Sequence, residues 1–418
     1  MASPCRLRPL DAVRGVAVLG ILLLNIIDLA MPGYAYVDPR FYGGATGPNW
    51  WAWALAYVVA DGKMRGMFTM LFGASTVLIA ERARASGQAP ALVHYARMAT
   101  LFVIGMLHAY LIWSGDILVL YAVCGAVIFA ARRWRPPLLL TVGIALLAFK
   151  LINGITAYAQ VDALRTAASR PGASSSEKVP WQAFQAHAAP SPSSIPGELA
   201  SHRGTYAQAL AERFRTTIFM QTVINAQALI DTLGLMLIGM ALYLTGFFSG
   251  VWTERSYWIA AAPIPLVWLC YIPLITWLER TGHSPLTMIA TEAIQLTLLR
   301  PVLSLGYAAL VVLFIQSNKG RRLADRLVAT GRMAFSNYLS TSILGTLLFN
   351  GYGLGWYGYL ERWQCFPVVV AMWLLMLAWS KPWLERFAYG PFEWIWRSLA
   401  RGHLQPFRRH SRTANASQ

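Results

Sequence analysis

A series of apolar runs, most of them close to 20 residues long, is the feature that most constrains how this chain folds. A helix of about 20 apolar residues spans the ~30 Å hydrocarbon core of a bilayer. A membrane barrel would instead need ~10-residue segments of alternating polarity, which the sequence lacks. The sequence therefore predicts an all-α polytopic membrane protein with about ten transmembrane helices, at residues 10–31, 64–80, 96–113, 117–131, 138–158, 217–248, 257–277, 286–316, 333–349 and 366–379.

The supply of charged residues supports the same fold class. Only 13% of the 418 residues are charged, whereas soluble domains carry about 25%. The net charge of +17 would also fit a nucleic-acid-binding protein, but topology selection produces the same excess of Lys and Arg in cytoplasmic loops. We therefore expect the lipid bilayer as a partner and no nucleic acid. The four cysteines lie far apart and predict no metal site.

The distribution of Lys and Arg predicts the orientation of the helices. With the N-terminus inside, the cytoplasmic segments hold 22 of the 35 Lys and Arg residues, and the external segments hold nine. Six of those nine fall in one long loop, where charges count for little. The bias therefore predicts that both termini are cytoplasmic.

The runs divide the chain into four parts. Residues 1–160 hold helices one to five, and residues 216–400 hold helices six to ten. Residues 161–215 form an external loop whose Ala-, Ser- and Pro-rich middle we expect to be partly disordered, and which could cover a site. Residues 401–418 form a basic cytoplasmic tail. The sixth run, 217–248, is long enough to be tilted or broken near Gly234.

Two residues near the third and fourth runs could carry proton chemistry. His108 lies in an apolar run, and a neutral imidazole accepts protons near pH 7. On a continuous helix Asp116 would be ~12 Å away along the axis. A chain reversal at Ser114 and Gly115 would bring the two side chains together, although nothing in the sequence shows one. The alternative is a histidine that is satisfied by a neighbouring helix.

Helix one begins with charged residues and carries an amide further along. Asp11 and Arg14 are three residues apart, which places them on one face of the inner end. They could bind an anionic cofactor, or they could serve as a helix start with Asp11 at the positive end of the dipole and Arg14 reaching the interface. Asn25 lies three turns beyond Arg14, where a buried amide needs partners.

Ionisable residues also lie at the outer entry to helix two and inside later runs. Charged groups within a membrane are expensive and are functional candidates by default. Asp61 and Arg65 are four residues apart and could pair, while Arg300 needs a counter-charge that Asp231 or Glu292 could supply. We assign substrate binding to Asp61, Lys63, Arg65, Asp231, Glu292 and Arg300. Anchoring at the interface is the alternative for the first three.

Helix nine has a polar start on the cytoplasmic side. Arg332 and Asn337 lie there, and Arg397 follows the last run. Such a face packs against other helices more often than it binds a ligand, but together with Arg14 it could meet an anion. We therefore add these three residues to Asp11 and Arg14 as a cofactor-binding group.

Several stretches together resemble the YeiB-like family of bacterial membrane proteins. They are spread over nearly the whole chain, at residues 10–25, 61–73, 105–121, 233–246, 331–339 and 390–397. That family is similar, more distantly, to transmembrane acyltransferases, which share Asp-x-x-Arg-Gly and a polar residue about eleven positions after the Arg. The bacterial O-acyltransferase branch has a catalytic histidine at that position, where this chain has Asn25.

A second branch, the lysosomal amine-acetylating one, also has Asn there but uses a histidine in the following loop. Residues 32–63 contain none, so either His108 takes over that role or the protein is not an acyltransferase.

The resemblance implies an acyltransferase in the bacterial cytoplasmic (inner) membrane. Acyl-CoA would be the donor, with no permanently bound cofactor, and the acceptor would be a sugar, an amine or a lipid-linked molecule. His108 would act as base, Asn25 would stabilise the oxyanion, and Asp116 would orient the imidazole or the acceptor. A transporter or permease for a small solute, with embedded charges along its path, is the alternative. A non-catalytic membrane scaffold is a third.

Overall fold

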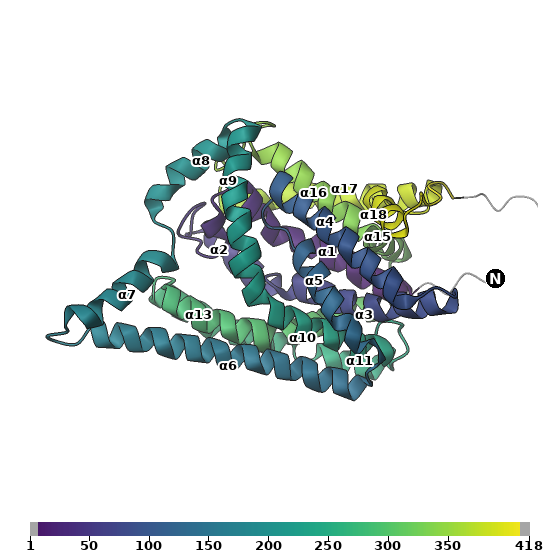
Figure 1. Ribbon diagram of the computed structural model, residues 1–418, viewed down its shortest axis with the longest axis horizontal. Coiled ribbons are helices and arrows are strands. Elements are labelled where there is room, and N and C mark those ends of the chain that lie inside the picture. The colour runs from purple at the N-terminus through teal and green to yellow at the C-terminus, as the bar shows by residue number, and fades with distance from the viewer. Residues whose placement is uncertain (1–6, 410–418) are drawn as a thin grey trace, which may run out of the picture.

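The computed structural model describes residues 7–409, and within them it is helical, with turns and one isolated antiparallel bridge between Phe387 and Arg408 (Figure 1). Residues 1–6 and the end of the predicted basic tail, residues 410–418, lie outside the described residues. The helices are α1 Arg8–Ala30, α2 Pro48–Val59, α3 Lys63–Ala85, α4 Pro90–Leu111, α5 Leu118–Ile128, α6 Pro136–Ala168, α7 Ser175–Ala188, α8 Ile195–Arg203, α9 Tyr206–Phe219, α10 Asn225–Leu244, α11 Glu254–Ala261, α12 Ile264–Arg280, α13 Pro285–Ile294, α14 Arg300–Gln316, α15 Arg321–Arg332, α16 Ala334–Phe349, α17 Cys365–Arg386 and α18 Pro391–Arg401.

Seven helical stretches in the described part of the chain are long and apolar enough to cross a membrane. The predicted fold class, a multi-pass helical membrane protein, is therefore confirmed. They are α1, α4, α6, the rods α9–α10, α11–α12 and α13–α14, and the rod that ends with α17. The other three predicted runs are also helical, as α3, α5 and α16, but α5 and α16 have 11 and 16 residues and fall short of a ~30 Å span.

α1 is the central helix of the bundle. Of its apolar window 61% is buried, against 17% for α6, so α1 lies inside the protein and α6 lies at the edge. α1 packs against α3, α14, α15, α16 and α17. Figure 1 shows α15 and α18 at the end of the molecule where α1 begins, and α7 and α8 at the opposite end.

Two glycines bring α3 and α10 into backbone contact. A Cβ atom on Gly73 would lie 1.9 Å from the Met236 carbonyl oxygen, and one on Gly239 would lie 1.9 Å from the Met70 carbonyl oxygen. Small residues at such points let membrane helices approach closely, because lipid supplies no hydrophobic force between helices and dispersion must hold them together. This contact fixes α3 against α10.

The sixth run is interrupted at a different place from the one predicted. A π-helical turn at Met220–Ile224 separates α9 from α10, while Gly234 lies within the regular α10. The predicted break near Gly234 is therefore wrong. A second π-helical turn, Gln295–Leu299, separates α13 from α14 directly before Arg300. Such turns often mark functional positions in helices.

The segment between the two bundles is mostly helical. α6 continues to Ala168, ten residues beyond the predicted end of helix five. α7 has no buried residue, which agrees with its Ala- and Ser-rich composition. α8 and α9 pack on each other, and α9 starts with a capping box at Thr205 and Gln208. The partial disorder expected for this segment stays a prediction.

We expect the substitution Gly239→Ala to destabilise the protein by about 1–3 kcal/mol, because a methyl group at this contact forces α3 and α10 apart. The measurement is the melting temperature of the purified protein in detergent micelles. Gly197→Ala is the matched control, since a Cβ there would meet nothing within 4 Å. Equal melting temperatures for the two variants would contradict the contact.

Candidate functional site

The turn after α4 joins the two residues that the sequence left ~12 Å apart on a continuous helix. α4 ends at Leu111, and the chain reverses before α5 starts at Leu118. Nδ1 of His108 therefore lies 2.8 Å from Oδ1 of Asp116. The other oxygen, Oδ2, accepts a hydrogen bond of 2.9 Å from the amide of Val119 and so caps the start of α5.

His108 and Asp116 form a buried pair, with exposed fractions of 1% and 6%. A carboxylate can only accept, so Nδ1 donates and Nε2 keeps its lone pair. Nε2 has no hydrogen-bond partner among the described residues. The rings of Tyr338 and Trp113 lie 5.4 Å and 6.2 Å from the imidazole, centroid to centroid. An oriented imidazole with an unused nitrogen is suited to accept a proton from a bound hydroxyl or amine.

Trp113 connects this pair to the C-terminal end of α1. Its indole Nε1 donates a hydrogen bond of 2.6 Å to Oδ2 of Asp28. Asn25, the predicted oxyanion residue, is half-buried on α1 one turn before Asp28. No described residue hydrogen-bonds to its amide, so the amide remains available to a ligand.

A small polar cavity of about 40 Å³ lies beside Trp113. α8 forms one wall, and its Glu198 accepts hydrogen bonds from the Gly33 amide at 2.8 Å and the Tyr357 hydroxyl at 3.1 Å. The polar residues that line the cavity are Asp28, Trp113, Ser114, Glu198, His202, Arg213, Thr216, Thr346, Asn350 and Tyr357.

Sequence reasoning missed the cavity. Asp28 is an acid inside an apolar run, which the rule on intramembrane charges would have found. Glu198 and His202 gave no signal, because they lie in a segment that reads as a solvated loop. A larger cavity of about 390 Å³, beside α16 and α17, is lined by apolar side chains and includes neither His108 nor Asp116.

The charged residues at the entry to α3 pair with other helices. Nη2 of Arg65 lies 2.7 Å from Oδ2 of Asp231 on α10. Nη2 of Arg300 on α14 lies 2.5 Å from Oδ2 of Asp61. The expected pair of Asp61 with Arg65 is therefore wrong, and the counter-charge of Arg300 is neither Asp231 nor Glu292. The two pairs tie α3 to α10 and α14.

Lys63 and Glu292 lie in contrasting environments. Lys63 is fully buried, where its ammonium donates to the Tyr57 carbonyl and lies 4.2 Å from the centre of the Tyr271 ring. Glu292 is exposed on α13. No ion pair within residues 7–409 includes Glu292, so it stands apart from the other predicted substrate-binding residues.

The predicted cofactor-binding residues lie at the opposite end of the bundle. Nη1 of Arg14 lies 3.3 Å from Oδ1 of Asp11, and Nη2 donates to Ser75 at 3.0 Å. Arg332 is the last residue of α15, which packs along α1, and the preceding Gly331 touches the Asp11 backbone. The structure thus brings these three side chains to one end.

A further arginine, which the sequence analysis did not select, joins this group. The guanidinium of Arg97 on α4 stacks 4.2 Å from the centre of the Trp396 ring, and the Trp396 indole donates to the Arg97 carbonyl. The positive charges of Arg397, Arg401 and Arg14 lie close enough to repel it. No ion pair of Arg97 occurs among the described residues. This concentration of positive charge suits a phosphate ligand.

α18 caps the start of α16 with a buried carboxylate. Oε1 of Glu393 accepts from the amides of Phe335 at 2.8 Å and Ser336 at 3.0 Å, which the helix leaves without partners. The amide of Asn337 donates to the Thr330 carbonyl and accepts from Trp379 at 2.9 Å. Asn337 therefore joins α15, α16 and α17, so its contacts suit a positioning role better than direct contact with a ligand.

The predicted site residues fall into three groups along the molecule. His108 and Asp116 form one with the cavity at Trp113, the charged pairs of α3 form a second, and the arginines near α18 form a third. Within residues 7–409, no group of three or more His, Cys, Asp or Glu could hold a metal ion. The roles assigned to these residues stay predictions.

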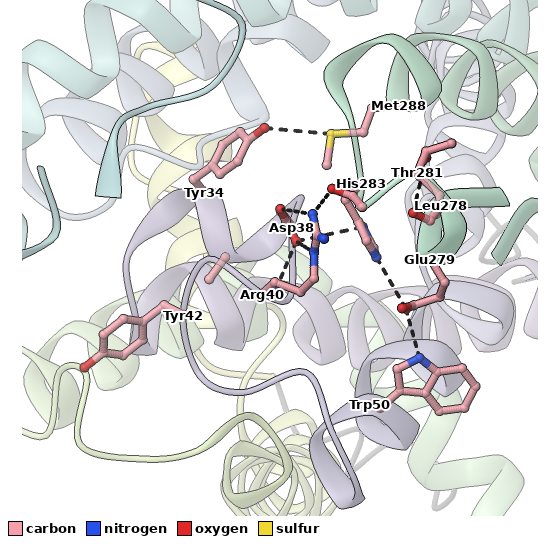
Figure 2. Close-up of polar contacts among 12 residues, drawn as sticks. Tyr34, Asp38, Arg40, Tyr42, Trp50, Leu278, Glu279, Thr281, His283 and Met288 are labelled. Carbon is pink, nitrogen blue, oxygen red and sulfur yellow. Dashed lines mark hydrogen bonds and ion pairs between the residues drawn. The ribbon is translucent and has the colours of Figure 1, made fainter. Parts of the chain in front are cut away.

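Another buried histidine, His283, joins the loop after α12 to the loop before α2 (Figure 2). His283 lies between Glu279, whose Oε1 is 3.4 Å from Nε2, and Asp38, whose Oδ1 is 3.9 Å from Nδ1. Arg40 pairs with Asp38 and donates to the Gly282 carbonyl, and Trp50 donates to Glu279. Burial lowers the pKa of His283, and the two carboxylates only partly oppose this effect.

Comparison with known proteins gives matches over most of the chain. Residues 242–403 match a family described as "Protein of unknown function (DUF418)". The chain is 30% identical over 405 residues to "Uncharacterized protein YeiB" of Escherichia coli (strain K12), a match that covers 93% of this chain and 95% of that protein. It is 27% identical over 411 residues to "Uncharacterized protein YxaH" of Bacillus subtilis (strain 168), with 96% of each chain covered. No solved structure matches.

Removing one partner of the pair between Arg65 and Asp231 should destabilise the bundle strongly. We expect Asp231→Asn to cost about 3 kcal/mol, because it leaves the Arg65 charge without a partner. Adding Arg65→Gln should restore part of the loss, because both charges are then gone. Equilibrium unfolding in mixed SDS micelles measures both. A double variant less stable than Asp231→Asn would contradict the pairing.

Acid should weaken the loop junction at His283. Its pKa in the folded protein lies below the ordinary 6.5, so the unfolded chain binds more protons as the pH falls through that value, and stability falls with it. We expect the melting temperature of the native protein to drop more between pH 7 and pH 5 than that of His283→Asn. Asn does not titrate and tolerates the positive φ of 48° at this position. Parallel curves for the two proteins would contradict this.

Proposed function

We propose that this protein is a transmembrane acyltransferase. The premise is that the chain belongs to the YeiB-like family of bacterial membrane proteins. It moves an acyl group from cytoplasmic acyl-CoA to a hydroxyl or amine of an acceptor. The observation that carries the proposal is the buried pair of His108 and Asp116, in which Nε2 has no partner among the described residues. A histidine that served packing alone would leave such an atom unsatisfied at a cost.

The pair supports one chemical step directly. The acceptor oxygen or nitrogen attacks the thioester carbonyl carbon, and its proton passes to Nε2 of His108. The carbon–sulfur bond then breaks, the acyl group stays on the acceptor, and the coenzyme A thiolate takes up the proton. Asp116 stabilises the imidazolium that forms in between, and the Asn25 amide donates to the oxyanion.

The arginines at the other end of the bundle supply the donor site. Arg14, Arg332 and Arg397, with Arg97 beside them, hold the phosphates of acyl-CoA, since guanidinium groups match phosphate geometry. Asp11 orients Arg14 by their ion pair. Asn337 acts indirectly, because its hydrogen bonds hold α15 and α16 against α17.

Helix geometry relates the donor site to the base. Arg97 and His108 are eleven residues apart on α4, which places them on one face about 16 Å apart. Arg14 and Asn25 have the same spacing on α1. Two helices therefore carry a phosphate-binding residue and a reacting residue at matched separation, which suits a donor that binds at one end and reacts at the other.

The topology proposed is ten transmembrane helices with both termini in the cytoplasm of a bacterium. Beyond the seven helices that meet the length and composition limits, the three further spans proposed are α3 and the shorter α16 and α5, of which α5 continues into the 3-10 turn Phe129–Arg133. The start of α1, with α15 and α18, lies at one end of the molecule (Figure 1), and these elements carry a large share of the arginines. The positive-inside rule then makes that end cytoplasmic in the inner membrane.

Transport of a small solute is the second candidate. The observation that favours it is the charge network of Asp61, Arg65, Asp231 and Arg300, which lies next to the π-helical turn before Arg300. Charges buried among membrane helices are often part of a substrate or proton path. Solute uptake that depends on a proton gradient and yields no covalent product would support this candidate instead.

We expect His108→Ala to lower acyl transfer by about 100-fold or more, the size of a lost general base. The measurement is transfer of label from acyl-CoA to an acceptor in proteoliposomes that contain the full chain. His187→Ala is the matched control, because His187 is exposed on α7 and should leave turnover unchanged. Undiminished turnover in His108→Ala would remove His108 from the mechanism. No transfer by the unaltered protein to any acceptor tested would overturn the enzyme assignment.

A further inference from the structure

The cavity beside Trp113 is lined by two carboxylates, Asp28 of α1 and Glu198 of α8. Oδ1 of Asp28 lies 3.3 Å and Oε1 of Glu198 lies 3.9 Å from the position that a Cβ on Gly33 would occupy. Because residue 33 is a glycine, that position is not filled by its own side chain. Neither carboxylate forms an ion pair with Lys or Arg within residues 7–409. Two carboxylates therefore line one cavity, and Oε1 of Glu198 already accepts from the Gly33 amide and the Tyr357 hydroxyl.

A third oxygen acceptor independently indicates a ligand. Asn350 is 3% exposed and lines the same cavity. Its Nδ2 donates to the Thr346 carbonyl at 3.1 Å and to the Tyr352 hydroxyl at 3.3 Å. Its Oδ1 has no hydrogen-bond partner among the described residues. A buried amide oxygen without a donor costs free energy, so a donor from outside would stabilise it.

The charge of the cavity sets the sign of that donor. Asp28 and Glu198 bring two negative charges, and Arg213 brings one positive charge, which it uses to donate to the Leu111 carbonyl and the Tyr352 hydroxyl. His202 stays neutral at pH 7, since burial lowers its pKa. One negative charge is left, and a monovalent cation would balance it.

We propose that this cavity binds the ammonium group of an amine-bearing ligand. An ammonium has three donors, and the cavity offers carboxylate or amide oxygens from Asp28, Glu198 and Asn350. The rings of Trp113 and Tyr357, which also line the cavity, add cation–π attraction. A volume of about 40 Å³ holds an ammonium and the carbon next to it, while the rest of the ligand extends outward.

A metal ion fits the cavity less well than an ammonium. Within the described residues, no group of three or more His, Cys, Asp or Glu is placed to ligate one. Two carboxylates with one amide oxygen fall short of the six to eight oxygens that a calcium ion takes. The inference rests on the proposed function in one respect: the ligand is the acyl acceptor, its ammonium holds it in the cavity, and a hydroxyl of the same molecule attacks the thioester and gives its proton to His108.

The test measures binding separately from turnover. Ethanolamine is titrated into the full-length protein in detergent micelles, and the rise in melting temperature gives an apparent Kd. Ethylene glycol, which replaces the ammonium by a hydroxyl, should give no rise at the same concentrations. Equal rises with both compounds would overturn the proposal.

Variants at two residues that line the cavity, Gly33 and Glu198, make the test specific. Gly33→Ala places a methyl group between the two carboxylates and should weaken ethanolamine binding at least tenfold, whereas Gly197→Ala on α8 meets open space and should leave it unchanged. If Gly33→Ala does not fold, Glu198→Gln should show the same loss. Native affinity for ethanolamine in every one of these two variants that folds would overturn the site.

The outcomes also separate this inference from the proposed function. His108→Ala should bind ethanolamine like the native protein while failing to transfer acyl groups. Binding without transfer in the native protein would leave the ammonium site standing and overturn only the enzyme assignment and the acceptor role. Transfer without ethanolamine binding would overturn the ammonium site alone.

Discussion

The carboxylate of Asp116 holds both the turn after α4 and the imidazole of His108 near the C-terminal end of that helix. One oxygen accepts from Nδ1 of His108 and the other from the amide of Val119. Because both bonds end on one rigid planar group, the start of α5 and the plane of the imidazole are set together. A carboxylate in an apolar interior is costly unless its oxygens are hydrogen-bonded, and these two bonds supply that compensation. The position of Trp113, and through it the contact with Asp28, depends on the same turn.

Much of the fold could be predicted from the sequence, because lipid dictates the length and composition of each helix. The pairing of side chains could not. Asp61 and Arg65 have the spacing of an ion pair on one helix, yet Arg300 and Asp231 take them, since the spacing in one helix says nothing about which helices are its neighbours. The contact between His108 and Asp116 depends on a turn of a few residues. In the sequence, only the Ser-Gly step at residues 114 and 115 indicates that turn. Glu198 and His202 were missed because the composition of a polar segment does not indicate whether it is solvated or packs against the bundle.

The two charged pairs also define the rotation of α3. Arg65 lies in the first turn of α3 and Asp61 lies two residues before the helix, and their partners lie on different helices, α10 and α14. Only a narrow range of rotations satisfies both, and the close approach at Gly73 and Gly239 fixes the distance as well. In a membrane, apolar helix surfaces pack almost equally well in many arrangements. A few polar contacts of this kind then select one helix arrangement among them.

The docking of α8 on the turn after α1 divides the candidate site between the helical bundle and the segment that joins its two halves. His108 and Asp116, the pair proposed to react, belong to the helical bundle, whose composition lipid constrains. Glu198 and His202 come from α8, in a segment between the two bundles, and connecting segments generally tolerate more insertions and composition changes than the elements they join. Ligand preference can therefore change through this segment while the pair of His108 and Asp116 stays intact. A graft of residues 161–215 between relatives would exchange the cavity wall that carries Glu198 and His202 and leave His108 and Asp116 unchanged.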